Sequence, residues 1–156
     1  MKKIFILLVC LAGLGYGQTT VPYLPEIPKI DGLLDNGTNR NSMGGYGVYR
    51  TYYEHPELYA AIAVLSGHPN LAQKWGGENE LNFLDAENLK KFRSVPIFIF
   101  HGRNDLNCPF NLTENLVKTL QSKNLDVTFV IGEEGHSSMS ESDRGKYHEW
   151  LKQQVK

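Results

Sequence analysis

Three short apolar runs constrain the fold of this chain more than any other feature. They cover residues 59–65, 95–100 and 126–131. Continuous apolar runs, as opposed to alternating ones, are typical of strands that are buried on both faces of a parallel sheet. Pro96 stands at the start of the second run, where a strand tolerates a residue without an N–H. The sequence therefore predicts three buried strands at these positions.

Helical patterns separate and follow these runs. A helix is predicted over residues 44–55, ending before Pro56, and others over 110–123 and 143–155, with an irregular one over 78–92. Strands that alternate with helices predict an α/β architecture with a mostly parallel sheet. Each strand–helix–strand unit takes roughly 30 residues or more, so the length of the chain predicts about four strands.

The first 17 residues have the pattern of a secretory signal peptide. Lysines at positions 2 and 3 precede an apolar run over residues 4–14, and Gly15 and Gly17 supply small residues before a cut after position 17. The run is too short to span a bilayer and lies at the extreme N-terminus. We therefore predict a signal peptide over residues 1–17 and a secreted or periplasmic protein. The alternative is a buried N-terminal strand or helix.

The remaining residues are predicted to form one domain. Residues 18–41 are rich in proline and asparagine and are predicted to be irregular, whereas residues 42–156 hold all the strong patterns. The net charge of −1 becomes −3 without Lys2 and Lys3, and no basic run remains, which argues against a nucleic-acid partner. Cys108 is then the only cysteine, so the fold must hold by packing without an internal disulfide.

One serine lies in a setting that suits a nucleophile. In the run Ser42-Met43-Gly44-Gly45, glycines follow the serine closely. A nucleophilic serine on a sharp strand-to-helix turn needs small neighbours, because larger side chains would collide with the strand or the helix. The downstream half of this pattern is complete, whereas Arg40 stands two residues upstream, where a small residue is expected. The alternative is an ordinary helix that starts at a serine.

An acid and a base follow two of the predicted strands. Asp105 comes after the run 95–100, and His136 comes after the run 126–131. Because the carboxyl ends of parallel strands meet at one edge of a sheet, we expect both side chains there. A serine needs a base and a group that orients the base, and the order Ser, Asp, His is the one found in α/β-hydrolases. The alternatives are a helix-capping aspartate and an exposed loop histidine.

Other residues fit these roles less well. Ser66 is a rival nucleophile but lacks the flanking glycine pattern, and His101 closes a strand, where we interpret it as structural. His68 follows a strand exit, so we predict that it borders the substrate together with Trp75. The sequence shows no zinc-ligand spacing, phosphate loop or dinucleotide fingerprint, so neither a metal nor a cofactor is predicted.

Taken together, these segments resemble the C-terminal half of secreted α/β-hydrolase esterases. The similarity is to the phospholipase/carboxylesterase, feruloyl-esterase and prolyl-oligopeptidase-like branch, and it covers about residues 41–153. It rests on Ser42-Met43-Gly44-Gly45-Tyr46-Gly47, on residues 59–67, on residues 95–102 with Asp105, and on Glu134-Gly135-His136. The resemblance implies a partial α/β-hydrolase fold that lacks the N-terminal strands.

The resemblance also implies roles for the site residues. Ser42 would be the nucleophile, His136 the general base and acid, and Asp105 the group that orients His136. The backbone N–H of Met43 would be one oxyanion donor, whereas the loop that supplies the second donor in the family has no counterpart here. The implied reaction is hydrolysis of a carboxylic ester, small or polysaccharide-linked, through an acyl-enzyme.

Two other functions stay open at this point. The chain is either such an esterase, or a catalytically impaired remnant of one, or a serine peptidase of the prolyl-oligopeptidase type. A sheet without its N-terminal strands also has an unpaired edge, which predicts self-association.

Overall fold

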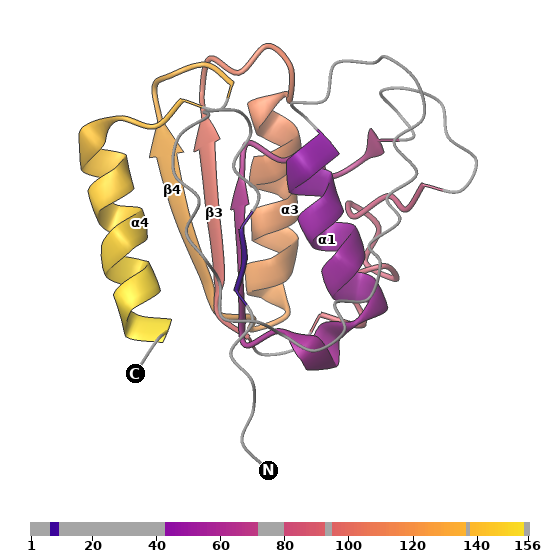
Figure 1. Cartoon of the computed structure of the whole chain (residues 1–156). Helices are drawn as coiled ribbons and strands as arrows, with labels where there is room; N and C mark the ends of the chain where they lie inside the picture. Colours follow the sequence, from indigo (N-terminus) through magenta and orange to yellow (C-terminus); the bar gives the residue numbers. More distant parts are fainter. Residues whose placement is uncertain (1–6, 10–42, 72–79, 93–94, 137, 155–156) are drawn as a thin grey trace.

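The computed structural model describes residues 7–9, 43–71, 80–92, 95–136 and 138–154. A four-stranded sheet lies between helices, with α1 and α3 on one face and α4 on the other (Figure 1). The strand order is β1-β2-β3-β4, and every neighbouring pair is parallel. The predicted α/β architecture with a parallel sheet of about four strands is therefore confirmed.

Most elements lie where the sequence predicts them. The elements, in chain order, are β1 (Leu7–Val9), α1 (Met43–Glu54), the 3₁₀ turn η1 (Pro56–Leu58), β2 (Ala61–Leu65), β3 (Ile97–Gly102), α3 (Phe110–Ser122), β4 (Val127–Gly132) and α4 (Glu141–Gln154). The strands β3 and β4 run past the apolar residues, because their pairing continues to Gly102 and Gly132. Glycines give no side-chain signal for a strand, so the sequence alone placed both ends too early.

The segment 80–92 is not a helix, which corrects the sequence prediction. Its hydrogen bonds are those of successive turns, and polar side chains organise them. Asn82 accepts the N–H of Leu84 through its side-chain oxygen and donates to Asp85, and Asn88 donates to the Asn82 carbonyl. Asparagine and aspartate offer the backbone local partners that compete with a helix, which accounts for the difference.

The strand β1 lies inside the segment predicted to be a signal peptide. Leu7, Leu8 and Val9 pair with residues 61–63 of β2, which is the N-terminal strand that the sequence left open as an alternative. Residues 10–42 lie outside the described residues, so the removal of residues 1–17 and the irregular segment 18–41 stay predictions. Among the described residues, no helix has both the length and the apolar character needed to cross a membrane.

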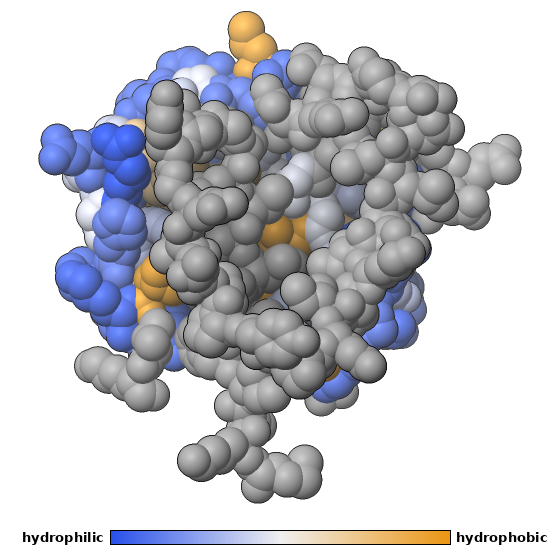
Figure 2. Space-filling model, viewed as in Figure 1, coloured by the Kyte–Doolittle hydropathy of each residue, from blue (hydrophilic) through white to orange (hydrophobic). Residues whose placement is uncertain are grey.

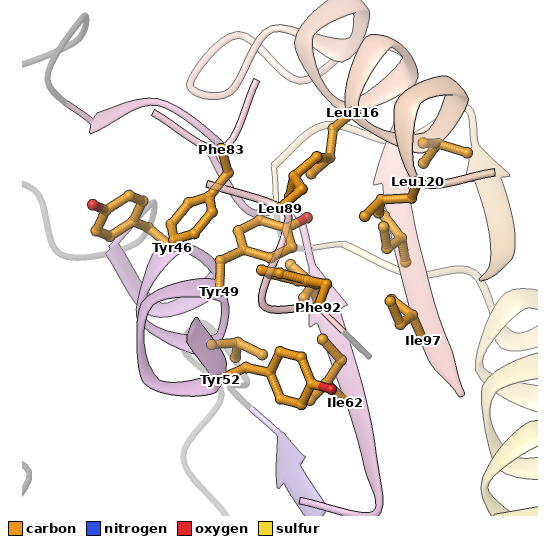
Figure 3. Packing of buried hydrophobic residues seen from close by; sticks show 14 of the residues in the cluster. Tyr46, Tyr49, Tyr52, Ile62, Phe83, Leu89, Phe92, Ile97, Leu116 and Leu120 are labelled. Carbon is orange, nitrogen blue, oxygen red and sulfur yellow. The ribbon is translucent and has the colours of Figure 1, made fainter. Parts of the chain in front are cut away.

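Each strand sends alternate side chains to opposite faces of the sheet. In β3, Ile97 and Ile99 face the larger core under α1 and α3, whereas Phe98 and Phe100 face the smaller core under α4. The larger core is rich in aromatic rings, which come from α1 and from the segment 80–92 (Figure 3). On the surface, the visible part of α4 is mainly hydrophilic (Figure 2). The two cores hold the three layers together and leave the carboxyl edge of the sheet for loops.

Candidate active site

Asp105 lies on the loop that connects β3 to α3, and its carboxylate is held by several donors. Its Oδ1 accepts the backbone N–H groups of Asn107 and Cys108, both at 2.8 Å. Its Oδ2 lies 2.8 Å from Nδ1 of His136 and 3.3 Å from Nε2 of His101. The side chain is fully buried. The loop therefore presents a carboxylate whose position and direction are set by its neighbours.

These donors outweigh the effect of burial on ionisation. Burial by itself raises the pKa of Asp105, because it disfavours the charged form. The hydrogen bonds from His101, from the Cys108 N–H and from His136 stabilise the carboxylate and lower its pKa from 3.8 to about 2. The group is therefore an anion at neutral pH, buried beside an imidazole.

His136 lies in the loop that follows β4, and its two ring nitrogens have different surroundings. Nδ1 donates to Asp105, because an ionised carboxylate can only accept. Nε2 is buried and has no hydrogen-bond partner among the described residues. The side chain as a whole is only 8% exposed. In this arrangement Nε2 is the nitrogen that is free to take a proton from a neighbouring group.

Close backbone packing brings the two loops together. A Cβ atom added to Gly102 would lie 2.0 Å from the carbonyl oxygen of Glu134, two residues before His136. Asn104 also donates to the carbonyl of Glu133 at 2.6 Å, and the Arg103 N–H donates to the Gly132 carbonyl. Only a glycine at the end of β3 lets the second loop cross this closely.

The helix α1 begins at the same edge of the sheet. A Cβ atom added to Gly45, in the first turn of α1, would lie 2.3 Å from Cα of Gly67, which follows β2. Gly45, the second glycine of the run Ser42-Met43-Gly44-Gly45, is therefore needed for close packing. Met43 is the first residue of α1, so its backbone N–H is one of the first-turn groups that have no partner within the helix. Ser42 and Trp75 lie outside the described residues.

The two remaining candidates, Ser66 and His68, lie just after β2. Ser66 is buried with a φ of 52°, a left-handed conformation, and its N–H donates to the Phe100 carbonyl. His68 is also buried, and its Nδ1 accepts the N–H of Asn70 at 3.1 Å. This contact stabilises a turn, and the assignment of His68 to substrate binding stays a prediction.

Three side chains at this site also have atoms that can ligate a metal. Ligand atoms of Asp105, Cys108 and His136 lie within 4.8 Å of one another. However, ligand atoms on one tetrahedral zinc lie roughly 3.3 Å apart, given bonds of about 2.0 Å. The 2.8 Å contact between Asp105 and His136 is that of a hydrogen bond. We therefore interpret the group as an acid–base pair beside a buried thiol.

Reasoning from the sequence missed the contacts of two residues in this network. His101 contacts Asp105, and Thr113 in α3 contacts His101. The spacing of four residues between His101 and Asp105, across a strand end, is a signal that could have drawn attention to the first. Thr113 carries a weaker signal, as a polar residue on the apolar face of α3.

The fold and the site together define an α/β-hydrolase type of protein. Its parallel sheet carries helices on both faces, and an acid and a histidine meet at its carboxyl edge. The chain belongs to the prolyl oligopeptidase family, whose family model matches residues 41–156. No curated protein matches the chain.

Solved structures of esterases and peptidases are similar to this chain. A thermostable esterase is 26% identical with a TM-score of 0.54, over 71% of this chain and 28% of that one. Arabidopsis thaliana SOBER1 is 21% identical with a TM-score of 0.52, over 77% and 56%. Porphyromonas gingivalis dipeptidyl peptidase 4 is 16% identical with a TM-score of 0.53, over 72% and 18%. The chain thus spans only part of the length of these proteins.

Proposed function

We propose that this chain carries the catalytic residues of a serine hydrolase that cleaves carboxylic esters through an acyl-enzyme. The observation that supports it is the buried pair of Asp105 and His136, in which Nδ1 is bound and Nε2 is not. A histidine held in this way is oriented to act as a general base and then as a general acid. Ser42, directly before α1, is the proposed nucleophile.

In the proposed reaction, Oγ of Ser42 attacks the carbonyl carbon of the ester while its proton moves to Nε2 of His136. The negative carbonyl oxygen of the tetrahedral intermediate accepts a hydrogen bond from the N–H of Met43, at the N-terminus of α1. The intermediate then releases the alcohol, which takes the proton from His136. Water then attacks the acyl-enzyme in the same way, with His136 taking its proton and passing it to Oγ of Ser42. The carboxylic acid and the free serine are formed.

The carboxylate of Asp105 assists by stabilising the imidazolium that forms in each step. Its lowered pKa keeps it ionised, so it holds Nδ1 protonated and leaves Nε2 as the basic nitrogen. The proposal therefore assigns one charge and one tautomer to the pair before the reaction begins.

A serine peptidase is a second candidate. The family model describes prolyl oligopeptidases, and one similar structure is a dipeptidyl peptidase. Esters are our first proposal, because the solved structure with 26% identity is an esterase. Comparison of p-nitrophenyl acetate with prolyl p-nitroanilides would decide between the two, since only a peptidase turns over the anilides at a comparable rate.

The direct test is labelling with a fluorophosphonate probe, which reacts with activated serines. We expect the folded protein to be labelled, and the Ser42→Ala and His136→Gln variants to lose the label. Ser138→Ala, at an exposed position near the site, is the matched control and should label normally. Folded protein that takes no label would support the impaired remnant instead.

We further propose that residues 1–17 direct secretion and that the sheet edge mediates self-association. N-terminal sequencing of the protein from its host should begin at residue 18. Self-association should then increase, because loss of β1 exposes the edge of β2 that it now pairs with. A chain that retains Met1, or a monomer after removal of residues 1–17, would contradict these two proposals respectively.

A further inference from the structure

His101 occupies a position in β3 from which it reaches the acid loop. It continues the face of Ile97 and Ile99, so its ring points toward α3, and it is fully buried. Nδ1 lies 2.9 Å from Oγ1 of Thr113, and Nε2 lies 2.8 Å from the carbonyl oxygen of Cys108. Both ring nitrogens are thus used by neighbours that belong to other segments.

The partners of His101 restrict its protonation state. A carbonyl oxygen only accepts hydrogen bonds, so Nε2 must carry a proton. Nδ1 faces a hydroxyl, which can donate to a neutral ring or accept from a charged one. In the neutral form, the single hydroxyl proton of Thr113 points at Nδ1 over 2.9 Å. In the charged form, Nδ1–H donates to the same hydroxyl oxygen, whose proton turns to the Gly67 carbonyl at 3.4 Å, so the contact with Thr113 holds the ring in either form.

The bond from Nε2 also holds the loop around Asp105. His101 donates to the carbonyl of Cys108, and the N–H of Cys108 donates to Asp105. Oδ2 of Asp105 is therefore flanked by two imidazoles, at 3.3 Å for His101 and 2.8 Å for His136. The proton on Nε2 thus points at the Cys108 carbonyl and lies near Oδ2, so His101 helps to fix the direction of the carboxylate that His136 contacts.

We propose that His101 is a positioning residue for the Asp105–His136 pair, and that Thr113 holds its ring with Nε2–H directed at the Cys108 carbonyl and the Asp105 carboxylate. The part that concerns turnover rests on the proposed function above. The role itself concerns only the direction of the Asp105 carboxylate. Thr113 therefore acts on His136 through three successive contacts, by way of His101 and Asp105.

The first test is imidazole NMR on the ¹⁵N-labelled wild-type protein. We expect His101 to show a protonated Nε2 with a hydrogen bond to the Cys108 carbonyl. An Nε2 without a proton would overturn the proposal. This measurement needs neither a variant nor catalytic activity.

The second test uses Thr113→Val, which keeps the shape of the side chain and removes the hydroxyl, with Thr113→Ser as the conservative rescue. In the valine variant we expect kcat/KM for p-nitrophenyl acetate to fall about 10- to 100-fold through kcat, with KM little changed. Thr113→Ser should restore kcat, and His148→Gln on the exposed side of α4 should leave it unchanged.

The outcomes separate the two proposals. The expected proton on Nε2 of His101, without any turnover in the wild type, would refute the hydrolase and support the positioning role. Turnover that depends on Ser42, together with an unchanged kcat/KM in Thr113→Val, would refute the positioning role alone. If the valine variant does not fold, the proton on Nε2 in the wild type decides.

Discussion

Polar side chains are buried both at the carboxyl edge of the sheet and inside the aromatic core between α1 and α3. At the edge, Asp105 and His101 have their polar atoms matched by named partners. In the core, the hydroxyl of Tyr49 is fully buried and has no partner among the described residues (Figure 3). Burial raises the pKa of Tyr49, so this hydroxyl stays protonated.

The comparison shows that a polar group without a hydrogen-bond partner has different consequences in the core and at the sheet edge. Tyr49 belongs to the hydrophobic cluster under α1 and α3, where a missing hydrogen bond only costs stability. Nε2 of His136 is also unpartnered, but it lies at the sheet edge, in a ring whose other nitrogen is bound to a carboxylate. The first is a cost of packing a tyrosine, whereas the second suits a group that exchanges a proton.

The largest expected effect follows from a change at the carboxylate. In Asp105→Asn, the amide can donate to Nδ1 and favours the wrong tautomer of His136, so we expect ester hydrolysis to fall about 10⁴-fold. The rate constant for p-nitrophenyl acetate, measured on protein with a native circular dichroism spectrum, tests this. Asp126→Asn, at an exposed position, is the control, and an equal loss there would contradict the assignment.

The contact between the two loops can be broken at Gly102. The Cβ of Gly102→Ala would lie 2.0 Å from the Glu134 carbonyl, so we expect a loss of about 3 kcal/mol in the free energy of unfolding. Gly145→Ala in α4 meets no atom within 4 Å and should instead stabilise the protein by about 0.5–1 kcal/mol. Urea denaturation measures both, and similar effects at the two glycines would show that the close approach is not needed.

Acid should reduce the stability that Asp105 contributes at the edge of the sheet. The folded-state pKa of Asp105 is lowered to about 2, so its contribution is complete above pH 4 and is lost as the pH falls toward 2. A shift of this size corresponds to roughly 2 kcal/mol. Chemical denaturation at a series of pH values should show this loss in the wild type and a smaller one in Asp105→Asn. Equal slopes in the two proteins would remove Asp105 as the cause.

The smallest effect concerns the core. Tyr49→Phe removes the unpartnered hydroxyl and should raise the free energy of unfolding by about 1 kcal/mol. Tyr46→Phe is the matched control, because the Tyr46 hydroxyl accepts the Leu81 N–H at 2.8 Å, and its loss should destabilise by about 1 kcal/mol. Thermal denaturation followed by circular dichroism compares them. Destabilisation by both substitutions would mean that Tyr49 also has a polar partner.

The apolar runs were sufficient to predict β2, β3 and β4. Both β2 and β3 are buried throughout, as such runs predict, whereas β4 lies at the edge of the sheet and most of its residues are half-buried. The helices α1, α3 and α4 also lie within two residues of their predicted starts. The segment 80–92 was misread, since its leucines contact the core from turns, a pattern that cannot be told from a helix by spacing alone.

The candidate site was predictable only in part. The sequence by itself determined which strands end beside Asp105 and His136, because parallel strands bring their carboxyl ends to one edge. Only the tertiary structure decided how these side chains meet. The approach of the Glu134 carbonyl to Gly102, and the partners of His101 on α3 and on the Cys108 carbonyl, join segments that are distant along the chain. Hydrogen bonds depend on distance and direction to within tenths of an ångström, and that precision comes only from the packed backbone.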